Sequence, residues 1–232
     1  MSEATSPKPV SSFDLFSKSW EAVQRNLVVF AILSAPTLIG TVLSLFMSNT
    51  NEQSFTKATD FFGNQSGLAL AGLAGGAVVL TIVLMVVGVI LQALMYIAQL
   101  RSAEGKTITL SGIWEEAKGQ ILKLFGLSIV TGIITAFSFI LLIIPGFIMM
   151  RRYFLAPYLM VDKKLTIGEA MEQSAAMSKP FSWSIYGIIG VTFLIGLIGI
   201  VPVVGGIAST LAAIAYSVAP ALRYLELKKM SA

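Results

Sequence analysis

The feature that most constrains this sequence is a run of 43 residues, 180–222, without Asp, Glu, Lys or Arg. A single helix of that length would be about 64 Å long, roughly twice the thickness of a bilayer's hydrocarbon core. The run must therefore fold back on itself. Pro202 lies near its middle, close to Gly205 and Gly206, and proline and glycine both favour a break there. We expect two helices, near 183–201 and 203–222.

Three further uncharged runs are long enough to cross a membrane, namely 27–47, 67–100 and 124–150. Only 12% of the residues are charged, about half the share that is usual in a soluble domain. Hydrophobic residues make up 56% of the chain. Such a composition excludes a water-soluble globular domain and a disordered chain. The sequence therefore predicts an all-α fold, a polytopic transmembrane helical bundle.

We expect about six spans, arranged as three helical hairpins. In the run 124–150 the break is expected at Pro145 and Gly146, with a returning arm that carries Arg151 and Arg152. Glycines at 72, 75 and 76 indicate a short outer helix or turn before the second span. The predicted spans are 27–47, 77–100, 121–144, 146–161, 183–201 and 203–222. The alternative is five spans, with 124–150 as one tilted helix that ends at the two arginines.

The basic residues predict the orientation of the chain. Apart from Arg151 and Arg152, 13 of the 14 remaining Lys and Arg residues lie in segments that six spans would place on one side with both termini. Lys and Arg concentrate in cytoplasmic loops, so both termini are expected in the cytoplasm of a multi-pass cell-membrane protein. Residues 1–11 are expected to be a disordered tail and 12–228 a single transmembrane domain. The first span is expected to act as an uncleaved signal.

An amphipathic segment precedes each predicted hairpin, over 12–20, 110–118 and 167–175. In the first of them Phe13 and Phe16 recur at helical spacing, which is typical of a helix lying in the headgroup plane. Residues 107–109 and 165–167 are expected to start the second and third helices. Trp20, Trp114 and Trp183 all fall at the predicted cytoplasmic interface, where tryptophan anchors are common. The sequence thus indicates three repeats of an interfacial helix followed by a hairpin.

Arg151 and Arg152 are the sharpest candidate site. If 146–161 spans the membrane, they lie about 8–9 Å of helix rise from the outer turn, where a charge is costly. No Asp or Glu occurs within a predicted span, so a lipid phosphate or a transported anion is the expected partner. The alternative is that both side chains extend to an interface or mark the end of the helix.

Two glutamines are further polar candidates in the predicted spans. Gln92 and Gln99 lie on the second span, where they form either a polar path or hydrogen bonds between helices. The chain has no Cys and no His, which excludes a zinc site of thiolates or imidazoles, a Cys nucleophile and a His general base. We expect no catalytic residues, no metal and no cofactor. The net charge of +4 is attributed to topology and not to nucleic-acid binding.

One stretch resembles a known family. It carries Ile144-Pro145-Gly146, then Arg151, then Ala156-Pro157, then Val161-Asp162, and then Glu-Ala-Met-x-x-Ser at 169–174. This pattern resembles the YciC-like bacterial inner-membrane proteins and is similar to the membrane domain joined to some glycerophosphodiester phosphodiesterases. The resemblance implies a polytopic protein of the bacterial cytoplasmic membrane. The catalytic barrel of the fused phosphodiesterases has no counterpart here, so their activity is not expected.

The expected function is that of a non-enzymatic integral membrane protein in envelope or lipid homeostasis, acting through anionic lipid binding. The alternative is a small transporter or channel for an anionic or amphipathic solute. Membrane lipids are the expected partners, and a second copy of the chain or another membrane protein stays open as a partner.

Overall fold

The computed structural model describes residues 9–48, 67–201 and 204–231, and all regular structure within these ranges is α-helical. The all-α prediction is therefore confirmed. In chain order the helices are α1 (Asp14–Arg25), α2 (Leu27–Ser48), α4 (Gly67–Ala103), α5 (Leu110–Ala117), α6 (Ile121–Leu141), α7 (Ile143–Tyr153), α8 (Ala156–Lys163), α9 (Ile167–Ser178), α10 (Ser182–Ile198), α11 (Val204–Tyr216) and α12 (Ala219–Met230).

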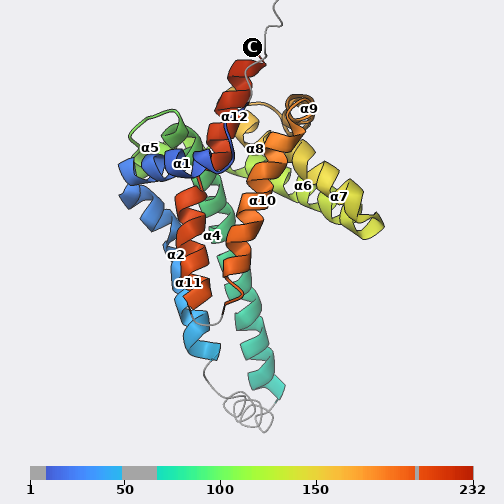
Figure 1. Ribbon diagram of the computed structural model, residues 1–232. Coiled ribbons are helices and arrows are strands. Elements are labelled where there is room, and N and C mark those ends of the chain that lie inside the picture. The colour runs from blue at the N-terminus through green and yellow to red at the C-terminus, as the bar shows by residue number, and fades with distance from the viewer. Residues whose placement is uncertain (1–8, 49–66, 202–203, 232) are drawn as a thin grey trace, which may run out of the picture.

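The helices form a long bundle with a wide end. Helices α2, α4, α10 and α11 extend in one direction, and α1, α5, α8, α9 and α12 gather at the opposite end (Figure 1). We call this assembly the basic end, because its helices and loops carry most of the Lys and Arg residues. Of the four extended helices, only α4 contains a basic residue in its described range, Arg101 in its last turn.

Three stretches in the described residues are long and apolar enough to cross a membrane, namely Ile82–Ala103, Ile121–Leu141 and Val204–Met230. Two sharply bent pairs, α1 with α2 and α9 with α10, raise the number to five if each pair counts as one span. Three to five candidate spans are consistent with a multi-pass membrane protein. The expected six spans are not confirmed.

The three amphipathic segments form helices α1, α5 and α9, as expected. Helix α1 meets α2 at 101°, and α9 meets α10 at 103°, so both turn sharply into a long apolar helix. Thr109 is the N-cap of α5 and accepts a hydrogen bond from the Gly112 amide at 3.2 Å. Thr166 is the N-cap of α9 and forms a capping box with Glu169. The predicted starts of both helices are therefore confirmed.

The predicted hairpin around Pro145 turns earlier than expected. Helix α6 ends at Leu141, Leu142 is extended, and α7 begins at Ile143. A proline ring clashes with the carbonyl four residues upstream, which for Pro145 belongs to Leu141. The helix must therefore stop there, and Pro145 lies in the first turn of α7, where its missing N–H is not needed. The alternative of one tilted helix over 124–150 is wrong.

The α6–α7 hairpin extends sideways from the basic end and does not run alongside the four long helices (Figure 1). Its returning arm also differs from the expected helix over 146–161. Helix α7 ends at Tyr153, and α8 starts at Ala156 with Pro157 in its first turn. At 1.5 Å per residue, the 11 residues of α7 rise only about 16 Å, too little to cross a bilayer.

Two other boundaries differ from the prediction. Helix α4 runs unbroken from Gly67 to Ala103, so the glycines at 72–76 produce no turn. Within a membrane a helix satisfies every backbone group, which favours its continuation through residues of low helix propensity. The predicted span 203–222 is divided at Ser217 and Val218 into α11 and α12, and Pro220 lies in the first turn of α12.

The core of the protein is concentrated at the basic end. Phe30, Ile97, Leu155 and Leu159 are fully buried there, and each such side chain contributes about 1.5–3 kcal/mol through burial. Large apolar side chains elsewhere are exposed, as at Ile140 in the α6–α7 hairpin, which is 78% exposed. A continuous exposed apolar surface is unfavourable in water and is typical of a lipid-facing surface.

Val10, which lies within the expected tail 1–11, contacts α12. Arg223, fully buried on α12, donates to the Val10 carbonyl at 2.6 Å and pairs with Glu226 at 2.5 Å. The Val10 amide in turn donates to Glu226 at 2.6 Å. These hydrogen bonds hold Val10 against α12.

Candidate functional site

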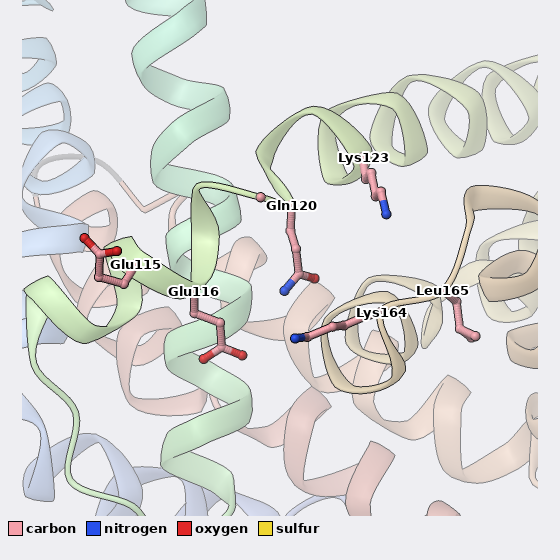
Figure 2. A pocket seen from close by; sticks show the side chains of 7 residues that line it. Glu115, Glu116, Gln120, Lys123, Lys164 and Leu165 are labelled. Atoms are coloured by element: carbon pink, nitrogen blue, oxygen red, sulfur yellow. The ribbon is translucent and has the colours of Figure 1, made fainter.

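The candidate site is a pocket of about 300 Å³ at the basic end, formed where α5 turns into α6 and faces the loop between α8 and α9. Figure 2 shows Gln120, Lys123 and Lys164 directed toward the same open space. Glu115 and Glu116 of α5 and Leu165 complete the labelled lining. We call this the phosphate pocket, after the ligand that we propose for it under the proposed function.

Gln120 is the residue from which α6 starts. It is only 7% exposed, and its Oε1 atom is buried with no hydrogen-bond partner in the described structure. An unpaired buried acceptor costs about 1–3 kcal/mol. This cost is removed if a bound molecule donates a hydroxyl or ammonium hydrogen to it.

Lys123 and Lys164 reach the pocket from different elements. Lys123 lies in the first turn of α6, and Lys164 ends α8 in a left-handed conformation with φ 54°. Neither lysine forms an ion pair within the described residues. A lysine in the first turn of a helix opposes the helix dipole, so two cations converge on an already positive helix end. This arrangement suits an anion.

The two glutamates of the lining are already paired with cations. Glu116 forms an ion pair with Arg101, and Glu115 forms one with Lys118 at 2.5 Å. Their charges are thus partly balanced from within the protein, while the charges of Lys123 and Lys164 are not. The pocket therefore offers two free ammonium groups for a phosphate and oxygen acceptors for neighbouring hydroxyls.

Arg101 also ties the loop after α4 to the site. It donates to both carboxylate oxygens of Glu104, at 2.9 and 3.0 Å, and Lys106 pairs with Glu104 at 2.7 Å. Burial raises the pKa of the Glu104 carboxyl, but the hydrogen bonds from Lys106 and Arg101 outweigh burial, and the net pKa is lowered. The network holds α4 against α5 next to the pocket.

Arg151 and Arg152, the sequence-based candidates, lie near the end of α7. The Nη1 atom of Arg151 donates to the hydroxyl of Ser182, at the start of α10, and its Nε is buried with no partner among the described residues. Arg152 is exposed, and its carbonyl accepts from Ser174 at 2.7 Å. The structure thus gives Arg151 a link between α7 and α10, whereas the Arg152 side chain is the more exposed of the two.

Gln92 and Gln99 both line a groove between α2 and α4. Gln92 donates to the Tyr96 hydroxyl at 3.3 Å, and Gln99 accepts from the Tyr158 hydroxyl at 2.7 Å. Each glutamine is therefore part of a hydrogen-bonded contact.

The three tryptophans all lie on elements of the basic end or at its border. Trp20 on α1 and Trp114 on α5 are about two-fifths exposed, at 40% and 42%. Trp183, in the first turn of α10, is 89% exposed and packs edge-on against Tyr186. All three side chains are exposed, and the role of interfacial anchors stays a prediction.

Two of the three predicted helix-break residues lie in the described structure. Pro145 stops α6 as described above, whereas Gly146 lies within α7 and is buried against Phe139 of α6. Pro202 falls outside the described residues.

Sequence reasoning missed Gln120, Lys123 and Lys164 as a group. One available signal was Lys123, because a cation in the first turn of an otherwise apolar helix is electrostatically unfavourable. The other two residues are brought beside it only by tertiary packing. No group of three or more His, Cys, Asp or Glu side chains in the described parts of the chain is arranged to hold a metal ion.

Comparisons of the chain with protein-family models, with curated proteins and with solved structures yield no match.

Proposed function

We propose that this chain is a non-enzymatic integral protein of the bacterial cytoplasmic membrane that binds the headgroup of an anionic phospholipid in the phosphate pocket. The observation that carries the proposal is that Lys123 and Lys164, which form no ion pair among the described residues, line one pocket with Gln120, whose buried Oε1 has no partner there. The resemblance of residues 141–180 to bacterial inner-membrane proteins adds support for the compartment. A role in envelope or lipid homeostasis follows from such binding.

The orientation that we propose places the basic end in the cytoplasm. Support comes from the distribution of Lys and Arg, which are nearly absent from the four extended helices. In this orientation α2, α4, α10 and α11 cross the bilayer, and the tryptophans of the basic end lie at its cytoplasmic surface. The phosphate pocket then lies at the level of lipid phosphates.

The chemistry of the pocket selects among headgroups. Two ammonium groups favour a phosphate diester that is not balanced by its own cation. The unpaired Gln120 oxygen favours a headgroup that also donates a hydrogen bond, such as the glycerol hydroxyls of phosphatidylglycerol. We therefore expect phosphatidylglycerol to bind more tightly than phosphatidylcholine, whose headgroup is zwitterionic and has no donor.

The test is retention of lipid by the purified full chain during detergent washing, measured by native mass spectrometry with added phosphatidylglycerol. The double variant Lys123→Gln with Lys164→Gln is expected to lose about 1–3 kcal/mol of binding, since two charge-assisted contacts are removed. The double variant Lys179→Gln with Lys229→Gln, two exposed lysines outside the pocket, changes the net charge equally and should retain the lipid.

Equal losses in the two double variants would reduce the interaction to general surface charge and contradict a specific pocket. Arg152→Gln is measured in parallel, because Arg152 is the member of the arginine pair that is exposed. Loss of lipid in Arg152→Gln, with full retention in the pocket variant, would move the anion site to the end of α7.

A further inference from the structure

A second cavity, of about 520 Å³, lies between α2 and α4 within the extended part of the bundle. It shares no lining residue with the phosphate pocket, and no charged side chain lines it. Gly88 and Gln92 on its wall are exposed, so the cavity is open on the surface of the candidate span Ile82–Ala103. We call it the α2–α4 groove. Its occupant in a membrane would enter sideways from the lipid.

The polar atoms of the α2–α4 groove are not all used within the protein. Gln99 accepts from Tyr158 through Oε1, which leaves the Nε2 donors of its amide without a partner among the described residues. The Tyr96 hydroxyl accepts from Gln92 and so keeps its own hydrogen to donate. The groove therefore offers two hydrogen-bond donors on successive turns of α4.

An acceptor is also present. The Oε1 atom of Gln92 lines the groove, and this residue donates to Tyr96 through Nε2, so its oxygen is left to accept. Donors and acceptors within a bilayer are costly when unpaired, so the groove is complementary to a ligand that both donates and accepts.

We propose that the α2–α4 groove binds diacylglycerol. Its headgroup is uncharged, which matches a groove without charged residues, because an ion would be desolvated there without a partner. Its one hydroxyl and two ester carbonyls match the mixed acceptors and donors of Gln92, Tyr96 and Gln99. The apolar wall toward Gly88 accommodates the start of the acyl chains. This site is independent of the phosphate pocket.

The test uses the full chain in nanodiscs with a diacylglycerol that carries a photoactivatable diazirine in one acyl chain. A phosphatidylcholine with the same diazirine chain is the second probe, and unlabelled diacylglycerol or an isoprenoid quinone is the competitor. Cross-linked peptides are mapped by mass spectrometry. The diacylglycerol probe should label α2 and α4 at the groove, and unlabelled diacylglycerol should suppress this labelling.

Gly88→Leu blocks the groove. A Cβ at Gly88 meets no atom within 4 Å, so the variant should fold, and its larger side chain fills the cavity. Gly132→Leu on α6 is the matched control, because a Cβ there also meets no atom within 4 Å. Groove labelling is expected to fall about tenfold in Gly88→Leu and to stay unchanged in Gly132→Leu. Tyr96→Phe removes one hydrogen-bond donor and should also weaken labelling of the groove.

Several results would overturn this proposal. One is equal labelling of the groove in Gly88→Leu and Gly132→Leu. A second is labelling of the groove by the phosphatidylcholine probe as strong as that by the diacylglycerol probe. A third is competition by the quinone but not by unlabelled diacylglycerol. The variant Lys123→Gln with Lys164→Gln should label as wild type does. If the phosphate pocket binds no phosphatidylglycerol while the groove still selects diacylglycerol, the proposed function fails and the groove proposal stands.

Discussion

At the scale of single residues, Gly146 of α7 lies close against Phe139 of α6. A methyl group at this position would overlap the ring of Phe139, whose centroid is 5.4 Å from that of Phe147. We expect Gly146→Ala to destabilise the protein by about 1–3 kcal/mol, the usual cost of overpacking. The midpoint of thermal unfolding in nanodiscs measures this. Gly132→Ala, with open space around the new methyl, is the control, and equal midpoints for the two variants would refute the close contact.

Asp162 provides a second prediction at this scale. Tyr224 and Lys228 each donate to its carboxylate at 2.5 Å. Burial raises the pKa of Asp162, but the hydrogen bonds from Lys228 and Tyr224 outweigh burial, so the pKa is lowered. A carboxyl whose pKa is lower in the folded state stabilises the protein above its unfolded pKa of about 3.9, and this contribution is lost as the pH falls through the folded pKa.

Asp162→Asn is therefore expected to lower stability at neutral pH and to make the loss of stability on acidification shallower. Thermal unfolding followed between about pH 7 and pH 3 measures both effects. Asp14→Asn, an exposed residue at the start of α1, is the control. Parallel pH profiles for wild type and Asp162→Asn would show that this carboxylate contributes nothing to acid sensitivity.

At the residue scale, predictions from sequence were correct where the structural feature depends on residues within one short segment. Pro145 ends a helix by a local clash, and Thr166 caps one by a local hydrogen bond. The phosphate pocket was missed because Gln120 and Lys164 meet only through the packing of α6 near the α8–α9 loop. The contact of Arg151 with Ser182 was missed for the same reason.

At the scale of elements, Asn26 ties the corner between α1 and α2 to the end of α4 and to the loop after it. The amide of Asn26 donates to the Ser102 hydroxyl and the Lys106 carbonyl, each at 3.0 Å, and its oxygen accepts from the Ile108 amide at 2.9 Å. Asn26→Ala leaves these groups unpaired and should cost about 1–3 kcal/mol. Chemical or thermal unfolding of the full chain measures the loss. The exposed neighbour Gln24→Ala should change stability little, and a neutral Asn26→Ala would assign the 101° bend to other contacts.

Pairs of the predicted repeat units share structural features. A short helix bends into a long apolar one at α1–α2 and at α9–α10. The second and third units each end in a helix with Ala-Pro in its first turn, Ala156-Pro157 in α8 and Ala219-Pro220 in α12. The sequence pattern identified helices α1, α5 and α9 because amphipathic spacing is local. It misplaced the ends of the hairpin arms, because tertiary contacts and proline position decide where an apolar run breaks.

At the scale of the whole molecule, the α6–α7 hairpin decides the number of crossings. The hairpin starts beside α5 and ends beside α8, both at the basic end, so it crosses the bilayer twice or not at all (Figure 1). Its sideways course and the short α7 favour insertion without crossing. The exposed apolar residues of its tip, including Leu142 and Ile144, would then be covered by acyl chains.

Single cysteines test this arrangement cleanly, because the chain has no Cys. With an impermeant maleimide on intact cells, Val201→Cys in the α10–α11 turn should be labelled. Ser111→Cys on α5 and Lys229→Cys on α12 should be labelled only after the cytoplasmic side is opened. Leu142→Cys at the hairpin tip should stay unlabelled from either side and react after denaturation. Labelling of Leu142→Cys from outside at the rate of Val201→Cys would instead establish a crossing hairpin, and with it the six spans that the uncharged runs of the sequence predict.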